Sequence, residues 1–497
     1  MRILFYYRNR ESLGIEYLSA VLKQAGHRVD LLFSPGLDDI FYFRNKFLNI
    51  FNNEDRLLEK AEKFSPDLVA FSSTTNEYPY VTHMANRLKQ RLNVPVIVGG
   101  IHPTAVPDLV LSNPNVDMIC RGEGELAILE LVNKMEKGMD FYNTRNIWFK
   151  KENGMIIRNE LRPLIDDLDS LPFPDKDLFH KYGCFNDLIA AISARGCLFN
   201  CTYCHNNLLR KLYAGKGKYI RRRSVRNLID ELKIYKEKYK NNKIIFEDDL
   251  FVKDRDWLEE FSYYYAREIK MPFYCNAFPL LIDEETVRIL KRAGCKILFM
   301  GIDCGSKSIR EKVLKRNTPE ELIKKNIDII KKHKILLELS IVFGWPEETP
   351  EDMWRSVKLI DNLKPSHVDG HILYLYPKTD ILEYCQNRGL VDDDTLSQIY
   401  EGKGGIVCES LLKHPYKDLA YVISKLLPLY VKTPVFLKPI VKKLMHPRMK
   451  KLANIIFVAM IPIAYPTRSL IRLKEFFLMA LTSIRKSTYA TVGRSHT

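Results

Sequence analysis

The sequence predicts an α/β protein with two successive sets of alternating strands and helices and a mainly helical C-terminal region. Short apolar runs separated by amphipathic stretches recur in both sets, which is the pattern of strands that alternate with helices. A chain of 497 residues also has room for about three domains. We therefore divide it into an N-terminal domain at 1–140, a linker at 141–184, a second domain at 185–400 and a C-terminal region at 401–497.

The N-terminal domain is predicted to be a Rossmann-like, doubly wound parallel sheet. Its expected strands are short apolar runs at 1–7, 28–33, 67–71, 94–98 and 116–120. The stretches between them have helical periodicity, and Gly26 ends the first helix. Ligands of such folds bind beyond the carboxyl ends of the strands, where this chain has loops at 9–14, 72–75 and 99–104.

The linker is predicted to begin with a small hairpin and to continue as an extended connection. Apolar segments at 147–150 and 155–158 flank the turn-forming pair Asn153-Gly154. Prolines at 163, 172 and 174 then indicate a segment without regular structure.

The second domain carries the strongest chemical signal. Cys197, Cys201 and Cys204 have the spacing C-x3-C-x2-C in a loop that directly follows an apolar run, and Tyr203 precedes the last cysteine. A [4Fe–4S] cluster normally takes four thiolates, so three cysteines leave one iron open to a ligand from outside the protein. The loop could instead hold zinc as a Cys3His site with His205, although the adjacent Cys204 and His205 are awkward joint ligands.

This cysteine motif resembles that of the radical S-adenosylmethionine (SAM) superfamily, in which SAM occupies the open iron. The resemblance implies a partial (β/α)6 barrel, with functional residues at the carboxyl ends of its strands. Six strand–helix units fit that barrel, with strands at 188–193, 243–247, 273–277, 297–302, 337–343 and 370–375.

The resemblance also implies which residues bind SAM. Tyr203 would stack on adenine, and the other implied SAM-binding residues are Asp248, Asp249, Asn276, Asp303, Gly344 and Glu347. The chain departs from the family pattern in two of these loops. Asp303 stands where the family usually has glutamate, and Glu347 stands where it usually has the glycine of Pro-Gly-Glu-Thr.

The first domain resembles the cobalamin (B12)-binding domain that precedes many radical SAM domains. The residues that this resemblance places at cobalamin are Ser72, Ser73, Thr74, Gly99, Gly100 and His102. Glycine lets the main chain approach a large flat ligand. The classical cobalt-binding motif D-x-H-x-x-G is replaced by residues 9–14, which contain no histidine. A Rossmann-like domain that binds no cobalamin is the alternative.

Together these resemblances imply an enzyme that uses a [4Fe–4S] cluster, SAM and cobalamin. It would cleave SAM reductively to a 5′-deoxyadenosyl radical and modify an unactivated carbon of a small or lipid-like substrate, most simply by C-methylation. An electron donor such as flavodoxin or ferredoxin would be required. Cyclisation or rearrangement is an alternative outcome, and a zinc-bound module without enzymatic activity is another. A tRNA methylthiotransferase would need three further cluster cysteines in the first domain, which has only Cys120.

The positive charge of the chain is concentrated near its C-terminus. Residues 419–497 hold fourteen Lys and Arg against one Glu, whereas the chain as a whole has a net charge of +16. The nearly neutral body argues against a nucleic-acid partner. We expect a cytoplasmic protein, because ten cysteines without a disulfide framework suit a reducing compartment. The basic, apolar segment at 419–497 is either a peripheral membrane surface or a helical cap over the barrel.

Overall fold

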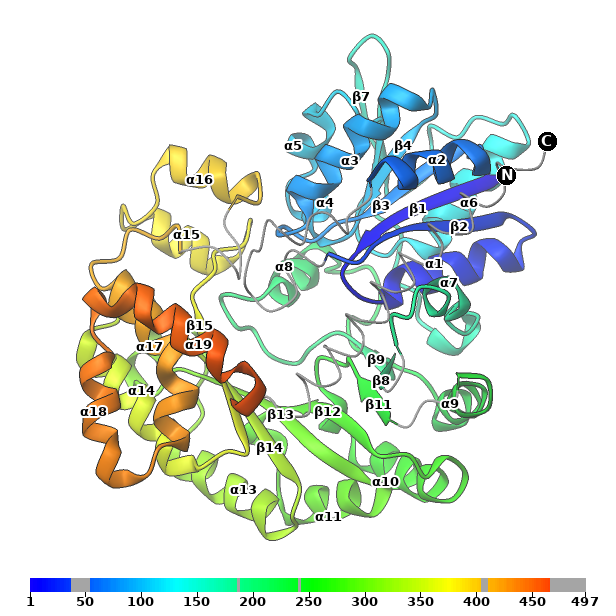
Figure 1. Ribbon diagram of the computed structural model, residues 1–497. Coiled ribbons are helices and arrows are strands. Elements are labelled where there is room, and N and C mark those ends of the chain that lie inside the picture. The colour runs from blue at the N-terminus through cyan, green and yellow to red at the C-terminus, as the bar shows by residue number, and fades with distance from the viewer. Residues whose placement is uncertain (37–53, 186–187, 240–242, 404–409, 465–497) are drawn as a thin grey trace, which may run out of the picture.

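The structure is a computed structural model that describes residues 1–36, 54–185, 188–239, 243–403 and 410–464 (Figure 1). Two α/β units lie next to each other, and the C-terminal helices pack against the second unit at the end far from the first (Figure 1). This arrangement confirms the predicted fold class.

The N-terminal sheet has seven strands in the order β2-β1-β3-β4-β5-β6-β7. The first five run parallel, whereas β6 and β7 form an antiparallel hairpin at one edge. The strands are β1 (Arg2–Arg8), β2 (Arg28–Ser34), β3 (Leu68–Ser72), β4 (Val96–Gly99), β5 (Met118–Cys120), β6 (Ile147–Lys150) and β7 (Ile156–Arg158). The hairpin expected in the linker therefore extends the sheet of the first domain.

Helices cover both faces of this sheet because successive strand side chains point to opposite sides. Ile3 and Phe5 pack with the helices of one face, and Leu4 and Tyr6 pack with those of the other. The first face carries α1 (Leu13–Gln24) and α6 (Glu125–Glu136). The second carries α2 (Glu54–Phe64), α3 (Tyr78–Arg91) and α5 (Pro107–Ser112), while the short α4 (Ile101–Ala105) follows β4.

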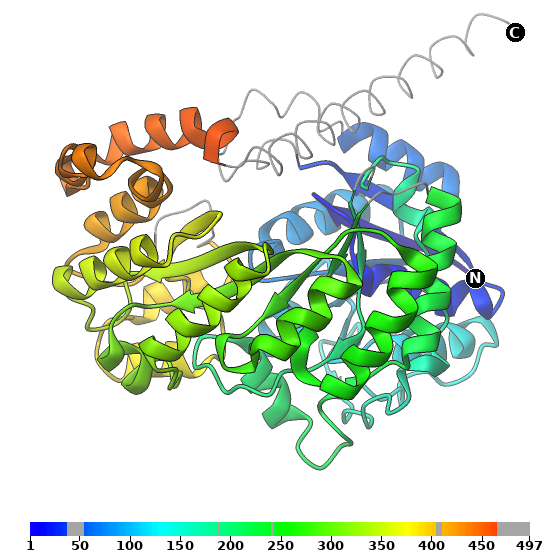
Figure 2. The ribbon, with the colours of Figure 1, turned by 90° about the horizontal axis from the view of Figure 1, so that it is seen from below.

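The second domain contains a six-stranded parallel sheet in the order β15-β14-β13-β12-β11-β8. Neighbouring strands follow one another in the chain, as in a partial barrel, and the outer helices form a row along the convex side (Figure 2). The strands are β8 (Leu188–Ala191), β11 (Lys243–Phe246), β12 (Phe273–Ala277), β13 (Cys295–Asp303), β14 (Leu336–Phe343) and β15 (His367–Ile372). The outer helices are α9 (Val225–Tyr239), α10 (Arg255–Tyr264), α11 (Glu284–Ala293), α13 (Glu320–Lys332) and α14 (Pro350–Leu363).

The connections of the second domain also contain shorter elements. The cysteine loop leads from β9 (Ala194–Arg195) into α8 (His205–Leu212), and β9 pairs with β10 (Arg221–Arg222). Three further short helices are α12 (Lys307–Lys312), α15 (Asp380–Gln386) and α16 (Asp393–Tyr400).

The C-terminal region packs on the edge strand β15. Its longest helix, α17 (Lys417–Lys432), approaches so closely that a Cβ atom on Gly370 would lie 2.4 Å from the carbonyl oxygen of Ser424. The remaining elements are η7 (Val435–Leu437), α18 (Lys438–Leu444), η8 (Pro447–Met449) and α19 (Lys450–Ala464). Within the described residues, no helix is long and apolar enough to cross a membrane.

A buried lysine of the linker joins the two domains. Lys176, at the start of α7 (Asp177–His180), is inaccessible to solvent, and its Nζ lies 2.9 Å from Glu11 and 2.7 Å from Glu16. Glu11 also accepts a hydrogen bond of 2.8 Å from the backbone N of Ala190 in β8. The loop after β1 is thus tied both to the linker and to the first barrel strand.

Replacing this lysine should loosen the domain interface. Lys176→Met leaves two carboxylates without their cation, and removing one partner of a buried ion pair typically costs about 3–5 kcal/mol. We expect a clear fall in the urea midpoint. The control Lys238→Met removes an exposed ion pair with Asp177 and should cost at most about 1 kcal/mol. Equal midpoints for the two variants would contradict this account.

Candidate active site

The backbone of the cysteine loop is held by groups other than the cysteines. Thr202 donates hydrogen bonds from Oγ1 to the carbonyl of Val313 (2.7 Å) and from its backbone N to the carbonyl of Leu314 (3.3 Å). Arg210 of α8 donates to the carbonyl oxygen of Cys197. The three cysteines are free and only half-buried, so their sulfur atoms are available as ligands.

The donor set fits an iron–sulfur cluster with one open iron. Burial raises the pKa of Cys197 to about 11 and raises that of Cys201, and a bound metal cation would favour their thiolate forms. Cys204 Sγ accepts from the backbone N (3.5 Å) and the side-chain amide (3.6 Å) of Asn206, which are the kind of contacts that tune cluster sulfurs.

The contacts of His205 do not favour the alternative Cys3His zinc site. The Nε2 atom of His205 lies 3.2 Å from the carbonyl oxygen of Pro377, and its ring packs against Tyr376. Among the described residues, no three His, Cys, Asp or Glu side chains are arranged to hold a single metal ion. A cubane cluster differs because each thiolate binds a separate iron.

Two of the predicted SAM-binding residues, Asp248 and Asn276, make contacts next to the end of the first barrel strand. Asp248 is fully buried and accepts hydrogen bonds from the backbone N (3.0 Å) and Oγ (2.5 Å) of Ser193. Asn276 donates to the carbonyl oxygen of Asp248 (3.0 Å). The neighbouring Asp249 borders a large cavity, and burial raises the pKa of its carboxyl. Of these three residues, only Asp249 lines this cavity.

Tyr203 and Asp303 contact each other at the barrel mouth. The hydroxyl of Tyr203 donates to Asp303 Oδ2 (2.8 Å) and accepts from Arg316 (2.7 Å), which also forms an ion pair with Asp303. The ring of Tyr203 lies 5.2 Å from that of Trp345. Both rings line a cavity of about 240 Å³ beside the ends of β14 and β15.

The two residues predicted in the loop after β14 differ in position. Gly344 has a φ of 81°, and its N donates to Glu348 (2.6 Å). Glu347 is half-exposed and pairs with Arg388 (2.7 Å), so its carboxylate is engaged at the surface. The buried carboxyl is that of Glu348, whose pKa burial raises to about 8.

A cavity of about 460 Å³ lies between the two domains. The first domain lines it with residues from the ends of its strands, including Gly14, Ser72, Gly99 and Gly100. The second domain contributes Gly196 and Asn206 beside the cysteines, and Glu247 and Asp249 after β11. The predicted ligand edges of both sheets therefore open into one space.

Gly100 accounts for the close packing of the first-domain loops. It has a φ of 103°, and a Cβ atom there would lie 2.6 Å from the carbonyl oxygen of Ser73. Ser73 is buried and does not line the cavity, and neither does Thr74. The cavity wall here consists of main chain and small side chains, which suits a flat ligand.

His102 lies behind this wall. Its ring is fully buried, stacks near Tyr78, and contacts Thr75 Oγ1 at 3.2 Å through Nδ1. Burial lowers the pKa of His102 to about 3, with a smaller contribution from His205, so the ring is neutral. No histidine of the described residues lines the large cavity.

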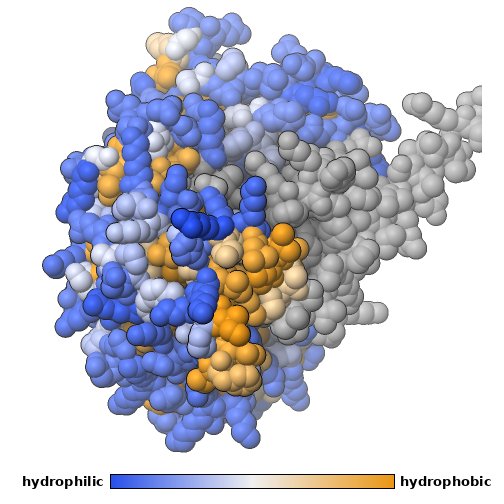
Figure 3. Space-filling view, turned by 60° about the vertical axis from the view of Figure 1, so that its left-hand side comes forward, coloured by the Kyte–Doolittle hydropathy of each residue, from blue (hydrophilic) through white to orange (hydrophobic). Residues whose placement is uncertain are grey.

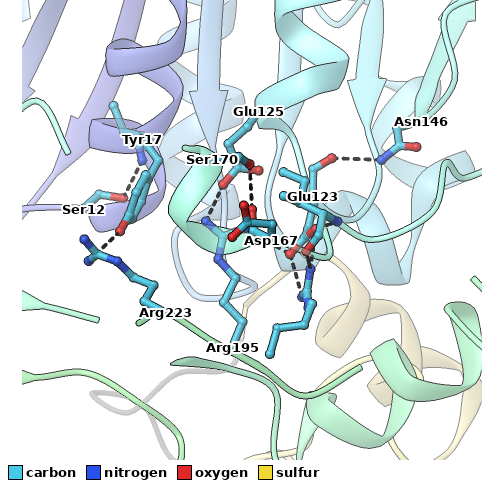
Figure 4. A network of polar contacts seen from close by, with 12 residues as sticks. Ser12, Tyr17, Glu123, Glu125, Asn146, Asp167, Ser170, Arg195 and Arg223 are labelled. Carbon is cyan, nitrogen blue, oxygen red and sulfur yellow. Dashed lines mark hydrogen bonds and ion pairs between the residues drawn. The ribbon is translucent and has the colours of Figure 1, made fainter. Parts of the chain in front are cut away.

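An ion-pair network that the sequence did not reveal joins the cysteine loop to the first domain (Figure 4). Arg195, two residues before Cys197, donates to Glu123 (3.0 Å) and Glu125 (2.6 Å). Arg221 in the paired strand β10 donates twice to Glu123, at 3.0 and 2.8 Å. Burial opposes ionisation of Glu123, but the hydrogen bond from Arg221 and the charges of both arginines lower its pKa overall. The sequence signals for these residues are Arg195-Gly196 directly before the cysteines and Glu123-Gly124-Glu125 shortly after the apolar run at 116–120.

Comparison with known proteins agrees with this geometry. The B12-binding domain model matches residues 9–132, and the radical SAM superfamily model matches residues 191–360. The chain belongs to the radical SAM superfamily and carries an N-terminal B12-binding domain. It is therefore a radical SAM enzyme, and its cofactors are a [4Fe–4S] cluster, SAM and cobalamin.

Several characterised or named proteins resemble this radical SAM enzyme along most of its length. An uncharacterized methyltransferase of Pyrococcus horikoshii is 28% identical, over 76% of this chain and 79% of its own. The anaerobic magnesium-protoporphyrin IX monomethyl ester cyclase of Rubrivivax gelatinosus is 24% identical, over 79% and 71%. Among solved structures, the radical SAM methyltransferase TsrM of Kitasatospora setae, with cobalamin and a [4Fe–4S] cluster bound, has a TM-score of 0.63 at 16% identity and covers 78% of this chain and 75% of its own.

The three loop cysteines should determine iron content. Cys201→Ala removes one of three thiolates, so we expect anaerobically reconstituted protein to lose most of its iron and acid-labile sulfide. The control Cys385→Ala removes a buried free cysteine outside the loop and should keep both. His205→Gln should also retain iron. A Cys201→Ala protein with full iron content would contradict the assignment.

Proposed function

We propose that the protein is a cobalamin-dependent radical SAM C-methyltransferase that acts on an unactivated carbon of a small or lipid-like substrate. The observation that carries the proposal is the cavity of about 460 Å³, because it is bordered by the ligand edges of both domains. A corrin held by the first domain would then face SAM at the cysteine loop across one space. When bound, SAM at the reduced cluster supplies a radical that abstracts hydrogen, and cobalamin supplies the methyl group.

The residues of this chain would hold and shield these groups. Cys197, Cys201 and Cys204 would bind three irons. Asp249 would accept hydrogen bonds from the ammonium or ribose of SAM, and Tyr203 would contact adenine beside the cysteine loop. Asp303 would act through Tyr203 by fixing the orientation of its hydroxyl. Asp248 and Asn276 would position the cysteine loop without contacting SAM.

For cobalamin we propose contacts from Ser72, Gly99 and Gly100, which border the large cavity. Ser73 and Thr74 would support these residues from behind. His102 would have no direct role at cobalt, since its ring faces Tyr78 and Thr75. Cobalamin would thus be held without a histidine ligand from the described residues.

Filling the large cavity should remove cobalamin selectively. Gly99 borders the cavity, and a Cβ atom there meets its nearest neighbour at an ordinary 3.6 Å, so Gly99→Leu adds bulk to the cavity without a backbone clash. We expect reconstituted Gly99→Leu to bind cobalamin at least about tenfold more weakly and therefore to lose the corrin absorption bands. Its iron content should not change. Cys201→Ala should show the reverse. Corrin retention by Gly99→Leu would count against the proposed site.

Cyclisation is the second candidate, because the relative from Rubrivivax gelatinosus is named a cyclase. The two outcomes differ in the fate of the methyl group of SAM. We expect the reduced holoenzyme, given trideuteromethyl-SAM and a small-molecule extract of source cells, to yield a product that gains three deuterium atoms. A product that loses hydrogen without gaining the label would favour cyclisation.

The protein takes a small-molecule substrate and requires a reductant. We propose that the reductant is a flavodoxin or ferredoxin, because both deliver single electrons at low potential. We also propose that the protein resides in the cytoplasm and binds the inner membrane surface through the segment at 419–497. Residues 465–497 of this segment lie outside the described residues.

An exposed apolar area supports the membrane proposal. Val435, Phe436 and Ile455 are 80%, 77% and 67% exposed on η7 and α19, and Figure 3 shows an apolar area on the side where the C-terminal helices lie. Lys443, Arg448 and Lys451 are exposed around it, and residues 419–464 contain no acidic side chain. Apolar side chains surrounded by cations suit an anionic lipid surface.

Vesicle binding tests the membrane proposal. We expect the full chain to float with vesicles that contain phosphatidylglycerol and to bind phosphatidylcholine vesicles several-fold more weakly. Phe436→Asp combined with Ile455→Asp should abolish flotation. The control Leu336→Asp changes a side chain that is 53% exposed at the start of β14 and should have no effect. Flotation that persists in the double variant would exclude this surface.

A further inference from the structure

The smaller cavity has a wall that does not come from the barrel. Its barrel side consists of Tyr203, Trp345 and residues 369–376 of β15 and the loop that follows. The opposite wall comes from α17 and α19, through Tyr421, Ser424, Lys425 and Phe457. The C-terminal helices thus enclose a space of about 240 Å³ beside the strand ends.

Lys425 is a partly buried cation that has no counter-charge among the described residues. Its Nζ lies 4.5 Å from the ring centre of Phe457 and 5.5 Å from that of Tyr421. Within the described part of the chain it makes no hydrogen bond or ion pair. Burial alone lowers its pKa, with no contribution from any acidic group. Withdrawing an ammonium partly from water costs free energy unless an anion compensates it, and two aromatic faces compensate it only in part.

Asp369 and Tyr203, which also line this cavity, have their own partners. Asp369 lies on the lining, but its Oδ1 atom is 3.1 Å from Nε2 of His367. Tyr203 is engaged with Asp303 and Arg316 on the side away from the helices. Among the residues that the structure describes, no acidic group is therefore paired with Lys425.

We propose that this cavity binds the acidic end of the substrate, a carboxylate or phosphate attached to an apolar or aromatic body. Lys425 would be its counter-charge, and Trp345, Tyr421 and Phe457 would contact the apolar part. The inference rests on the proposed function, because it assigns a substrate class to the same barrel mouth. A uniformly apolar or a cationic substrate does not fit this wall.

The experiment uses the reconstituted holoenzyme and a matched pair of probes. The probes are 3-phenylpropionate and its neutral analogue 3-phenylpropanamide, and binding is measured by calorimetry with and without SAM. We expect the acid to bind at least tenfold more tightly than the amide, whether or not SAM is present. Lys425→Met should abolish the difference, Lys425→Arg should keep most of it, and Lys417→Met, an exposed lysine at the start of α17, should change nothing.

Several results would overturn the proposal. Equal affinity for acid and amide would show that the cavity does not select an anion, as would a preference that survives in Lys425→Met. Loss of probe binding when SAM is added would assign the cavity to SAM. Formation of 5′-deoxyadenosine without substrate should be unchanged in Lys425→Met, and a fall would likewise place Lys425 at SAM. A protein that shows no corrin bands but still prefers the acid in a Lys425-dependent way would refute the proposed function. It would not refute this site.

Discussion

The ion pairs between Arg195 and the carboxylates of Glu123 and Glu125 are the contact on which the composite site depends. They join the strand that enters the cysteine loop to the loop that closes the first-domain sheet. Arg221 forms a second ion pair with Glu123, so each charged group of this partly buried interface has a partner of opposite charge. Losing one partner of such a network leaves an uncompensated charge. Each of these ion pairs therefore helps to hold the two domains in their relative position. The cavity between the domains is lined by residues of this contact, including Arg195, Glu123 and Glu125.

Residues at the strand ends divide into those that face ligand space and those that support them. Asp248 and Asp249 are adjacent, yet the first is bound to Ser193 and the second borders the large cavity. Glu347 and Glu348 differ in the same way, since one pairs at the surface and the other is buried under the loop of Gly344. Both pairs lie in loops that follow strands, where the local backbone conformation turns neighbouring side chains in different directions, so position in sequence alone does not assign their roles.

Much of the fold and the centre of the site could be predicted because they depend on local patterns. Apolar runs located the strands of both sheets to within a few residues, and the spacing of Cys197, Cys201 and Cys204 indicated the cluster. The pairing of Arg195 with Glu123 could not be predicted, because it joins residues 72 positions apart through tertiary contact. The sequence of the hairpin β6–β7 indicates a turn, but it does not indicate which sheet the hairpin extends. The partial burial of Lys425 could not be predicted either, because it depends on how α17 packs on β15.

The central claim is that the cluster and the corrin occupy one cavity and face each other. Electron paramagnetic resonance of anaerobic holoenzyme, with the cluster reduced and cobalt in the paramagnetic +2 state, tests this most directly. The account predicts that each signal is broadened or split by the other, and that the interaction disappears in Gly99→Leu, which retains only the cluster. Two sharp, independent signals in the fully loaded wild-type protein would contradict it.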